Sequence, residues 1–237
     1  MGPSVAADGS NRWRRHDRAV TQCRLCPRLV AYREQVAREK RRQYRDDTYW
    51  GRPIPGFGDR GARLLIVGLA PAAHGANRTG RMFTGDRSGE WLYAALHATG
   101  FASQATAVRP DDGLALIDAY VTAIARCAPP ANKPTPAEIA NCRPYLVREL
   151  ELLDRVRVVV CLGGLALDGF LRAWRESGRL PPAKRPRFAH GAEYPIAGGI
   201  ALLCSYHPSQ QNTFTGRLTR AMLDAVFARA REVLDTA

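Results

Sequence analysis

Four short apolar segments, separated by helical segments, constrain the fold of this chain more than any other feature. They span residues 63–68, 119–125, 157–162 and 200–206. Each is almost wholly apolar, which is typical of strands that are buried on both faces of a parallel sheet. The helical segments between them are long enough to cross back over such a sheet. We therefore predict a parallel sheet covered on both faces by helices, with ligands bound at the carboxyl ends of its strands.

The remaining segments complete this plan. The spacing of apolar residues predicts helices over residues 88–99, 135–153 (with Thr135 as the N-cap), 164–176 and 215–234. Residues 11–44 are also expected to be helical, with a break around Cys23 and Cys26, and the Pro- and Gly-rich residues 49–61 are expected to form an irregular loop. We expect residues 1–10 to be disordered and residues 11–237 to form one domain.

The net charge is the first pointer to a partner. Hydrophobic residues make up 46% of the chain and charged residues 24%, as in folded globular proteins rather than disordered ones. The net charge is +13, and 32 of the 35 basic residues are arginine. A GC-rich genome would explain the choice of arginine over lysine but not the excess of positive charge. Because guanidinium groups contact phosphates bidentately, the excess favours nucleic acid as the partner.

No apolar run approaches the roughly 20 residues that a membrane span needs. The N-terminus also lacks the apolar core of a signal peptide. We therefore expect no membrane contact and a cytoplasmic, monomeric protein that associates with the bacterial nucleoid.

Four of the six cysteines form two pairs. Cys23 and Cys26 have C-x2-C spacing, whereas Cys127 follows the second apolar segment and Cys142 lies in the next helical segment. Because disulfides are rare in the cytosol, the pairs indicate metal binding, with coincidental buried thiols as the alternative. Four thiolates suit either zinc or a [4Fe–4S] cluster, and spacing alone does not separate the two. The other two cysteines lie inside apolar segments, where we expect simple burial.

The loop after the first apolar segment, residues 68–86, is long and rich in glycine. Glycine lets backbone N–H groups approach a ligand closely, but the loop lacks the Gly-Lys-Ser/Thr ending of a Walker A loop. It carries an aromatic ring, a carboxylate, an imidazole and two guanidinium groups: Phe83, Asp86, His74, Arg78 and Arg81. A loop of this length without secondary structure is usually functional, although an ordinary crossover loop ending in an N-cap is the alternative.

Two further loops leave the ends of predicted strands. His207 ends the fourth apolar segment and is followed by a polar run, whereas Asn132 lies in the Pro-rich loop after the second segment. A lone histidine is more often structural, yet its place at a strand end makes catalysis an equal alternative. For Asn132 a turn is the default interpretation. Since the carboxyl ends of parallel strands share one edge, we expect all three loops to converge.

Together these motifs resemble those of the family-5 (type B) uracil-DNA glycosylases, which are relatives of the family-4 iron–sulfur enzymes in the uracil-DNA glycosylase superfamily. The resemblance extends over residues 23–219 and rests on residues 23–29, 55–59, 68–86, 126–135 and 207–219. It implies a three-layer α/β/α sandwich on a central four-stranded parallel sheet. It also implies monofunctional excision of deaminated bases from double- and single-stranded DNA, which initiates base excision repair.

The resemblance implies roles for individual residues as well. A [4Fe–4S] cluster is expected on Cys23, Cys26, Cys127 and Cys142. The catalytic residues are expected to be Asp86, Asn132 and His207. Substrate contacts are expected from Gly68, Leu69, Ala70, Pro71, His74, Phe83 and Ala123, with the Phe83 ring stacking on the extruded base. DNA contacts are expected from Ser209, Gln210, Gln211, Asn212 and Arg217.

One departure from the family pattern concerns base specificity. Where the uracil-specific relatives read the pyrimidine edge with an asparagine on the second strand, this chain has Ala123. Where other superfamily members place Asp, Asn or Glu after the first strand, it has Ala70, Pro71 and Ala72. Loss of a polar reader weakens discrimination, because the wrong base leaves no buried group unpaired. We expect the pocket to accept uracil and hypoxanthine, with xanthine and ethenocytosine as further candidates.

Breaking an N-glycosidic bond leaves positive charge on the sugar and negative charge on the base. We therefore expect Asp86 on the sugar side and His207 on the base side. Gln210 or Gln211 is expected to fill the gap left in the stack, and phosphates are expected to bind Arg24, Arg28, Arg217 and Arg220. The alternatives are a non-catalytic metal-containing nucleic-acid-binding module and a strictly uracil-specific family-4-like enzyme. A nucleotide hydrolase is disfavoured because the chain has neither a P-loop nor a carboxylate cluster for Mg²⁺.

Overall fold

A computed structural model describes residues 5–182 and 184–236. The described strands are β1 (Phe57–Gly58), β2 (Leu64–Gly68), β3 (Ala119–Ala123), β4 (Val158–Leu162), β5 (Glu193–Ile196) and β6 (Ile200–Ser205). The described helices are α1 (Val5–Thr21), α2 (Pro27–Glu39), α3 (Ala76–Thr79), α4 (Arg87–Ala98), α5 (Pro136–Leu152), α6 (Gly164–Glu176), α7 (Gln210–Phe214) and α8 (Arg220–Asp235), with short 3₁₀ turns η1 (Arg42–Tyr44) and η2 (Pro130–Asn132).

Within the described residues the strands form one sheet in the order β1-β3-β2-β4-β6-β5. Its four central strands are parallel, which confirms the predicted parallel sheet. The two outer strands, β1 and β5, pair antiparallel with their neighbours and were not expected. β1 is only two residues long, and β5 contains Pro195. Proline is tolerated on an edge strand but weakens the sequence signal for one.

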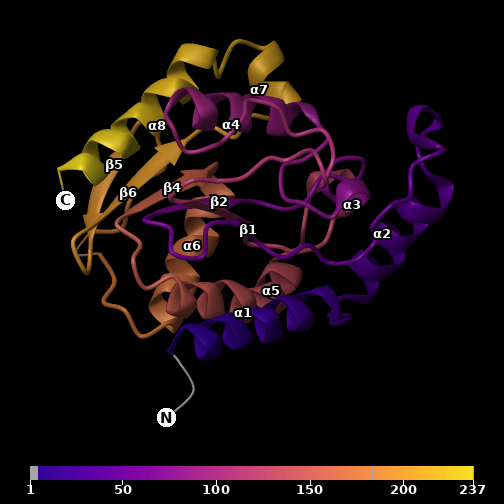
Figure 1. Cartoon of the computed structure of the whole chain (residues 1–237), viewed down its shortest axis with the longest axis horizontal. Helices are drawn as coiled ribbons and strands as arrows, with labels where there is room; N and C mark the ends of the chain where they lie inside the picture. Colours follow the sequence, from indigo (N-terminus) through magenta and orange to yellow (C-terminus); the bar gives the residue numbers. More distant parts are fainter. Residues whose placement is uncertain (1–4, 183, 237) are drawn as a thin grey trace.

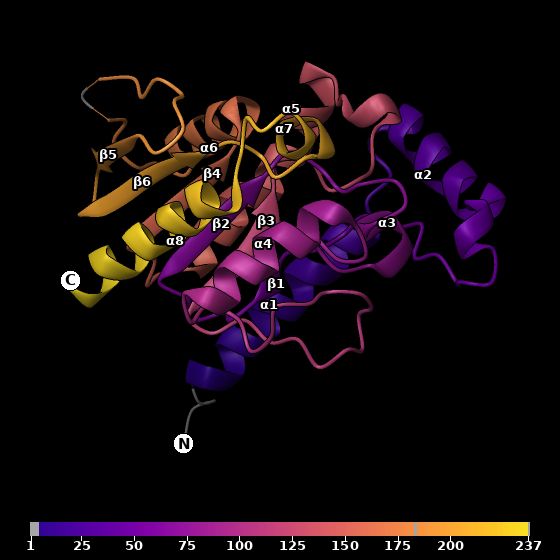
Figure 2. The ribbon, with the colours of Figure 1, turned by 90° about the horizontal axis from the view of Figure 1, so that it is seen from above.

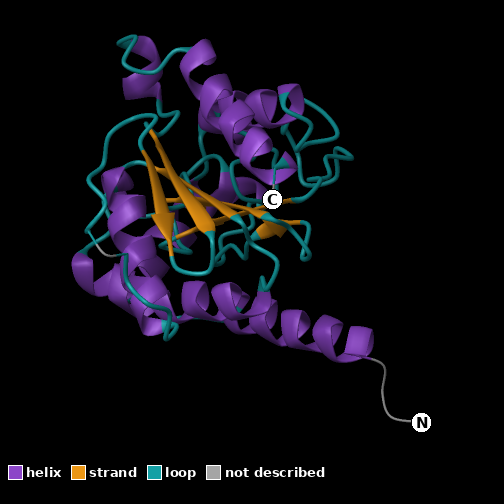
Figure 3. Cartoon of the chain, turned by 90° about the vertical axis from the view of Figure 1, so that its left-hand side faces the viewer, coloured by secondary structure: helices purple, strands orange, loops and turns teal. Residues whose placement is uncertain are grey.

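Helices cover both faces of this sheet, so the predicted α/β/α layering is confirmed (Figures 1 and 3). α4 and α8 pack on one face, where Leu92 and Phe227 lie in the same buried cluster as Ile66 of β2. α1, α5 and α6 pack on the other, where Phe170 lies in a cluster with the next β2 residue, Val67. Neighbouring residues of one strand thus face opposite helix layers, which explains why each central strand is apolar throughout.

The carboxyl ends of the parallel strands lie at one edge of the sheet. Gly68 at the end of β2 pairs with Ala123 of β3, and Leu162 of β4 pairs with Ser205 of β6. The loops that follow β2 and β6 lead directly into α3 and α7. Figure 2 shows α2 and α3 at one end of the molecule, with the C-terminus at the opposite end and α7 between the two. The fold therefore brings the three strand-end loops to one edge.

Two boundaries differ from the sequence expectations. α1 begins at Val5, so residues 5–10 form its first turns instead of a disordered arm, whereas residues 1–4 lie outside the described residues. Good helix formers at positions 6 and 7 outweigh the polar composition of this segment. The expected helix over 215–234 is split, because Gly216 has a left-handed φ of 70° and Thr219 caps a separate α8. No described helix is long and apolar enough to cross a membrane.

Candidate active site

Phe83 lies at the centre of the convergent edge. Its buried ring packs directly on Gly68, where an added Cβ would lie 2.8 Å from the ring Cζ. The ring is also 5.7 Å from the His207 imidazole, at an interplanar angle of 32°. Phe83 has a φ of 52°, a left-handed conformation that is strained for a non-glycine residue and that fixes the direction of its side chain. The structure thus brings together residues from the β2 loop and the end of β6, as the sequence predicted.

Asp86 is the N-cap of α4 and lies three residues beyond Phe83. Its Oδ1 accepts a hydrogen bond from the Gly89 N–H at 3.1 Å. Its Oδ2 faces Gly75, where any Cβ would clash with the carboxylate. Burial raises the pKa of Asp86 above its ordinary value, and the N–H groups of Gly89 and Ser88 offset part of that effect. Asp86 therefore forms the N-cap that the sequence analysis gave as the alternative for this loop, and its second carboxylate oxygen faces the glycine-rich loop at Gly75.

His207 follows β6 directly and is held through its backbone. Its carbonyl oxygen accepts hydrogen bonds from the Asn212 side-chain amide and the Ser209 N–H, both at 2.8 Å. Burial lowers the pKa of its imidazole to about 4. The ring is therefore neutral at physiological pH and offers one N–H donor and one acceptor.

His74 faces a tyrosine that the sequence analysis did not single out. The buried Tyr49 hydroxyl lies 3.1 Å from His74 Nδ1, and the two rings meet edge to face at 78°. Burial lowers the pKa of His74, with Arg41 and Arg78 adding to the effect. The only feature of the sequence that could have pointed to Tyr49 is that it is an aromatic residue at the start of a Pro- and Gly-rich loop.

The two arginines of the long loop hold the loop itself. Arg78 donates to the Asp47 carboxylate at 2.6 Å and to the carbonyl oxygens of His74 and Gly85. One terminal nitrogen of Arg81 donates to both carboxylate oxygens of Asp112, with both distances 2.8 Å. Such pairs fix geometry strongly, so the loop is a rigid wall and its guanidinium groups are already used.

The floor of the site is backbone and small side chains. Gly68 and Leu69 accept hydrogen bonds from the N–H groups of Ile124 and Ala125, both at 3.0 Å. The Ala123 methyl belongs to the same buried cluster as Phe83. Ala70 is partly buried and Pro71 is buried. As expected from the sequence, none of these residues has a polar side chain that could read the edge of a base.

Asn132 is the predicted catalytic residue that the structure does not join to the others. It is exposed in η2 with a left-handed φ of 56°. Within the described residues no hydrogen bond connects its side chain to Asp86 or His207. This conformation is typical of asparagine in a turn, which was the default interpretation.

The loop after His207 forms a short helix that was not predicted. Ser209 caps α7 by accepting a hydrogen bond from Asn212 N, and Gln210 and Gln211 are exposed. Phe214 ends α7 with 67% of its surface exposed and with the Arg87 guanidinium 4.4 Å above its ring. Sequence reasoning did not select Phe214, although an aromatic residue within a polar loop was a visible signal.

The basic residues expected on phosphates divide into two groups. Arg24 pairs with Glu34 at 2.6 Å, and Arg28 forms two hydrogen bonds with Glu138 at 2.6 and 2.8 Å. By contrast, Arg217 lies 4.5 Å above Tyr206, and Arg220 lies over the Trp91 ring. Arg217 and Arg220 make no ion pair with a carboxylate of the described residues. They therefore fit the predicted role of binding phosphates better than Arg24 and Arg28 do.

The four cysteines of the predicted centre lie near one another. Burial, together with the neighbouring thiols Cys23 and Cys26, raises the pKa of Cys127 to about 12 and of Cys142 to about 11. Asn141 donates to Cys26 Sγ at 3.5 Å. Within the described residues no three His, Cys, Asp or Glu side chains converge closely enough to hold a single metal ion. A [4Fe–4S] cluster does not require the four thiolates to converge on one point, because each thiolate binds a different iron atom of the cluster.

The surroundings of the cysteines suit an anionic group. Arg33 is 2% exposed, lies close enough to Cys127 to lower its thiol pKa, and has a buried Nε without a hydrogen-bond partner among the described residues. The Arg126 N–H donates to Cys142, and its charge also favours the thiolate. Two buried cations beside four thiols are consistent with a negatively charged thiolate cluster.

Comparison with known proteins places this arrangement in a family. The family model described as "Uracil DNA glycosylase superfamily" matches residues 55–231. The type-5 uracil-DNA glycosylase of Mycobacterium tuberculosis is 54% identical over 215 residues, which are 90% of this chain and 79% of that protein. The type-5 enzyme of Thermus thermophilus is 52% identical over 214 residues, 90% of this chain and 94% of that protein. The type-4 uracil-DNA glycosylase of Archaeoglobus fulgidus is 35% identical over 114 residues, 48% of this chain and 49% of that protein.

The similarity to the type-5 proteins extends over most of both chains, whereas the type-4 match is partial. The chain therefore belongs to the uracil-DNA glycosylase superfamily and, within it, to the type-5 uracil-DNA glycosylases.

Proposed function

We propose that this chain removes uracil from DNA by extruding the nucleotide and hydrolysing its N-glycosidic bond. The observation that carries the proposal is the contact between Phe83 and His207 at the carboxyl edge of the sheet, with the Asp86 carboxylate three residues beyond Phe83 in the same loop. Nucleic-acid binding alone does not need a carboxylate and an imidazole at such an edge. A base in the stack cannot reach these groups, so the nucleotide must first leave the duplex or enter from a single strand.

Each side chain has a separate task in the proposed reaction. The Phe83 ring replaces the stacking that the extruded base loses. The ionised Asp86 carboxylate faces the sugar, stabilises the positive charge there and accepts a proton from the attacking water. The water oxygen bonds to C1′ while the bond from C1′ to the base nitrogen breaks, and the electron pair of that bond leaves with the base. The neutral His207 imidazole donates a hydrogen bond to the base oxygen that becomes negative.

Two alanines beside the site support the proposal that bases other than uracil are also removed. Ala123 and Ala70 present methyl groups where a specific enzyme would present an amide or carboxylate. A pocket without a buried polar reader does not strongly reject a base with a different edge. We propose that hypoxanthine is also removed, with xanthine and ethenocytosine as further substrates.

The thiols of Cys23, Cys26, Cys127 and Cys142 would hold a [4Fe–4S] cluster. Bound there, the cluster would supply a covalent cross-link and no step of the hydrolysis. Cys23 and Cys26 lie at the start of α2, Cys127 lies in the loop after β3 and Cys142 lies in α5. The cross-link would thus fasten α2 to the sheet and to α5, beside the Arg28–Glu138 pair. Iron and sulfide analysis of the purified protein tests this, and stoichiometric zinc without iron would contradict it.

Release of free base from matched oligonucleotides tests the proposed function. Duplexes carrying one uracil, hypoxanthine, xanthine or ethenocytosine are incubated with excess enzyme, and free base is measured in a single turnover. We expect release of uracil and hypoxanthine, with abasic sites left uncut because the enzyme is monofunctional. DNA binding without release of any base would instead support the non-catalytic module, and release of uracil alone would contradict the broad pocket.

A further inference from the structure

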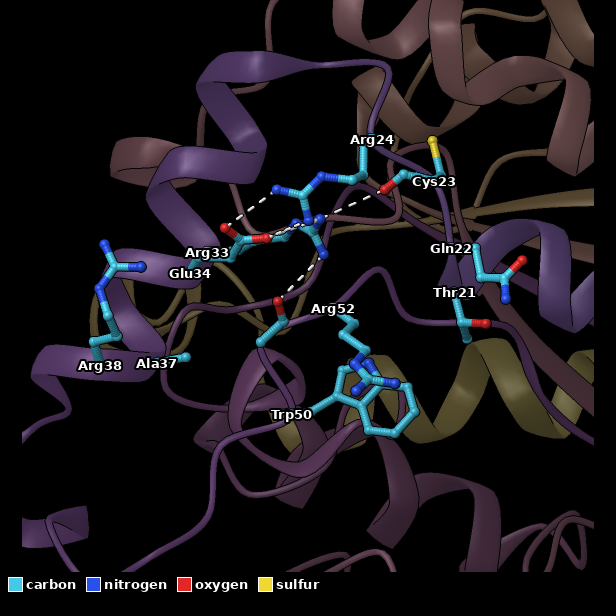
Figure 4. A pocket seen from close by; sticks show the side chains of 11 residues that line it. Thr21, Gln22, Cys23, Arg24, Arg33, Glu34, Ala37, Arg38, Trp50 and Arg52 are labelled. Atoms are coloured by element: carbon cyan, nitrogen blue, oxygen red, sulfur yellow. Dashed lines mark hydrogen bonds and ion pairs between the residues drawn. The ribbon is translucent and has the colours of Figure 1, made fainter.

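A groove outside the active-site pocket has a composition that the base-excision chemistry does not require. It lies between the end of α1, the start of α2 and the segment around Trp50, with a volume of about 500 Å³. Figure 4 shows the guanidinium groups that surround it and the Trp50 indole at one side. Its basic lining residues are Arg24, Arg33, Arg38 and Arg52, and its one acidic residue is Glu34. Cys23 also lines it, so the groove borders the cysteine centre proposed above.

Trp50 is a fixed aromatic surface on this groove. Its Nε1–H donates to the Pro53 carbonyl oxygen at 3.1 Å. Gly80 packs so closely on the ring that an added Cβ would lie 2.9 Å from it. The indole is nevertheless 37% exposed, whereas the other three tryptophans of the chain are buried. The Arg52 guanidinium lies 5.6 Å from the ring centroid and belongs to an exposed side chain that can move aside.

Two of the four cations in the groove have no acidic partner. Arg24 is paired with Glu34, and Arg33 donates to the carbonyl oxygens of Gly51 and Cys23. Arg38 and Arg52 are exposed, and no carboxylate of the described residues lies within ion-pair distance of either. Exposed guanidinium groups beside an exposed indole form a combination that attracts phosphates and stacks a base.

The groove is joined to the active-site loop through α3. The Trp50 N–H donates to the Arg78 carbonyl oxygen at 2.9 Å, and the Gly51 N–H donates to the Asn77 carbonyl oxygen at 3.1 Å. Arg78 in turn donates from its guanidinium to the Gly85 carbonyl oxygen at 3.0 Å, one residue before Asp86. The Trp50 segment is therefore linked by hydrogen bonds, through the buried helix α3, to the loop that carries Asp86.

We propose that this groove binds an unpaired stretch of the DNA strand that carries the damaged base. One flanking base stacks on the Trp50 indole, and Arg38 and Arg52 contact phosphates. A base inside a duplex has no free face, so the groove selects unpaired DNA and directs the enzyme to single strands or melted junctions. The inference rests on the proposed function only in taking DNA as the substrate.

Binding of undamaged DNA separates this inference from catalysis. The probes are a labelled single-stranded oligonucleotide of mixed sequence and the corresponding duplex, both without damage, measured by fluorescence anisotropy at constant salt. We expect Trp50→Ala to weaken single-strand binding about 5- to 150-fold, since stacking on an aromatic side chain contributes about 1–3 kcal/mol per base. Trp50→Phe keeps a ring and is expected to retain most of the affinity. Duplex binding is expected to change less than about twofold.

Arg38→Glu is expected to weaken single-strand binding and to make it less sensitive to salt. Arg172→Glu, an equal change of charge at an exposed position of α6, is the control and is expected to have little effect. Circular dichroism melting shows whether each variant is folded. Folded Trp50→Ala with unchanged single-strand affinity, or with equal losses on both DNAs, would overturn the proposal. Normal single-strand binding without release of any base would instead overturn the proposed function and leave the groove standing.

Discussion

The Phe83 ring and the His207 imidazole lie 5.7 Å apart and are tilted by 32°, although they come from the first and last parallel strands of the chain. The contact brings together a ring that can stack on a base and an imidazole N–H. That N–H can donate a hydrogen bond to the oxygen of the base, which becomes negative as the base leaves. Burial lowers the pKa of His207 to about 4, so the donor is a neutral imidazole. A neutral donor suits a leaving base, because it stabilises the anion without first binding a proton from solvent.

The first prediction concerns the pH dependence that His207 confers. Its folded pKa of about 4 lies below the ordinary value of 6.5, so the unfolded chain binds the extra proton first as pH falls. This contribution to stability is fully present above pH 6.5 and is lost between pH 6.5 and about 4. Urea unfolding of the wild type and of His207→Gln at several pH values measures it. We expect the difference between them to shrink as pH falls through this window, and a constant difference would contradict a buried neutral imidazole.

The second prediction concerns the charge of Asp86. Asparagine is as good an N-cap as aspartate, so Asp86→Asn keeps the cap of α4 while removing the carboxylate charge. We expect base release to fall at least about 100-fold with unchanged DNA affinity and melting temperature. Asp111→Asn, an exposed carboxylate paired with Arg109, is the control and should act normally. Because burial raises the pKa of Asp86, wild-type activity should decline on acidification at a higher pH than an ordinary carboxylate would give.

The third prediction tests the close approach of Phe83 to Gly68. Gly68→Ala puts a Cβ 2.8 Å from the Phe83 ring, which must move away from its stacking position. A displacement of about 1 Å in an active site can lower a rate about 100-fold, and we expect a single-turnover rate reduced on that scale. Gly61→Ala, whose nearest contact would be an ordinary 3.5 Å, is the matched control. Equal rates for wild type and Gly68→Ala would show that the ring position is not needed.

The fourth prediction concerns a buried polar network beside the cysteines. Glu149 accepts hydrogen bonds from Arg126 and from the Thr122 hydroxyl at 2.7 Å, and it lies 3.3 Å from His16. Burial would raise the pKa of Glu149, but Arg126 and His16 outweigh it and hold the pKa at about 2. Glu149→Gln leaves Arg126 buried without its counter-charge, so we expect a loss of about 3–5 kcal/mol in the free energy of unfolding.

Urea titration at neutral pH measures that loss. The contribution of Glu149 is present above its ordinary pKa of 4.5 and is lost as pH falls towards about 2, so the two proteins should converge on acidification. Exchanging both Glu149 and Arg126 for apolar residues should destabilise less than the single change. A single variant as stable as the wild type would show that the ion pair does not hold α5 to the loop after β3.

The sequence predicted the central strands because each is a continuous apolar run, and it placed α6 at its observed bounds, Gly164–Glu176. It also selected His74, Phe83 and Asp86 together, because all three belong to one loop after one strand. Features that depend on long-range packing were not predictable in this way. β5 acquires its strand character only by pairing with β6, and the exposure of Phe214 depends on where α7 turns.

The same reasoning explains what was missed around the site. The Tyr49–His74 and Arg126–Glu149 contacts join residues that are far apart in the chain, and no spacing rule connects them. Arg24 and Arg28 were among the arginines expected on phosphates. The fold instead places a carboxylate against each, so their charges serve the packing of α2.

The last prediction decides which residue fills the gap left by the extruded nucleotide. The sequence pointed to Gln210 or Gln211, whereas the structure adds Phe214, which is 67% exposed and fixed by Arg87, the residue after Asp86. Apolar side chains are the usual wedges between base pairs, so Phe214→Ala should slow uracil release from duplex DNA about tenfold and leave release from single-stranded DNA unchanged. Phe214→Leu should keep most of the duplex rate, since leucine also wedges. A larger duplex-specific loss in Gln210→Ala or Gln211→Ala than in Phe214→Ala would assign the wedge to the glutamine instead.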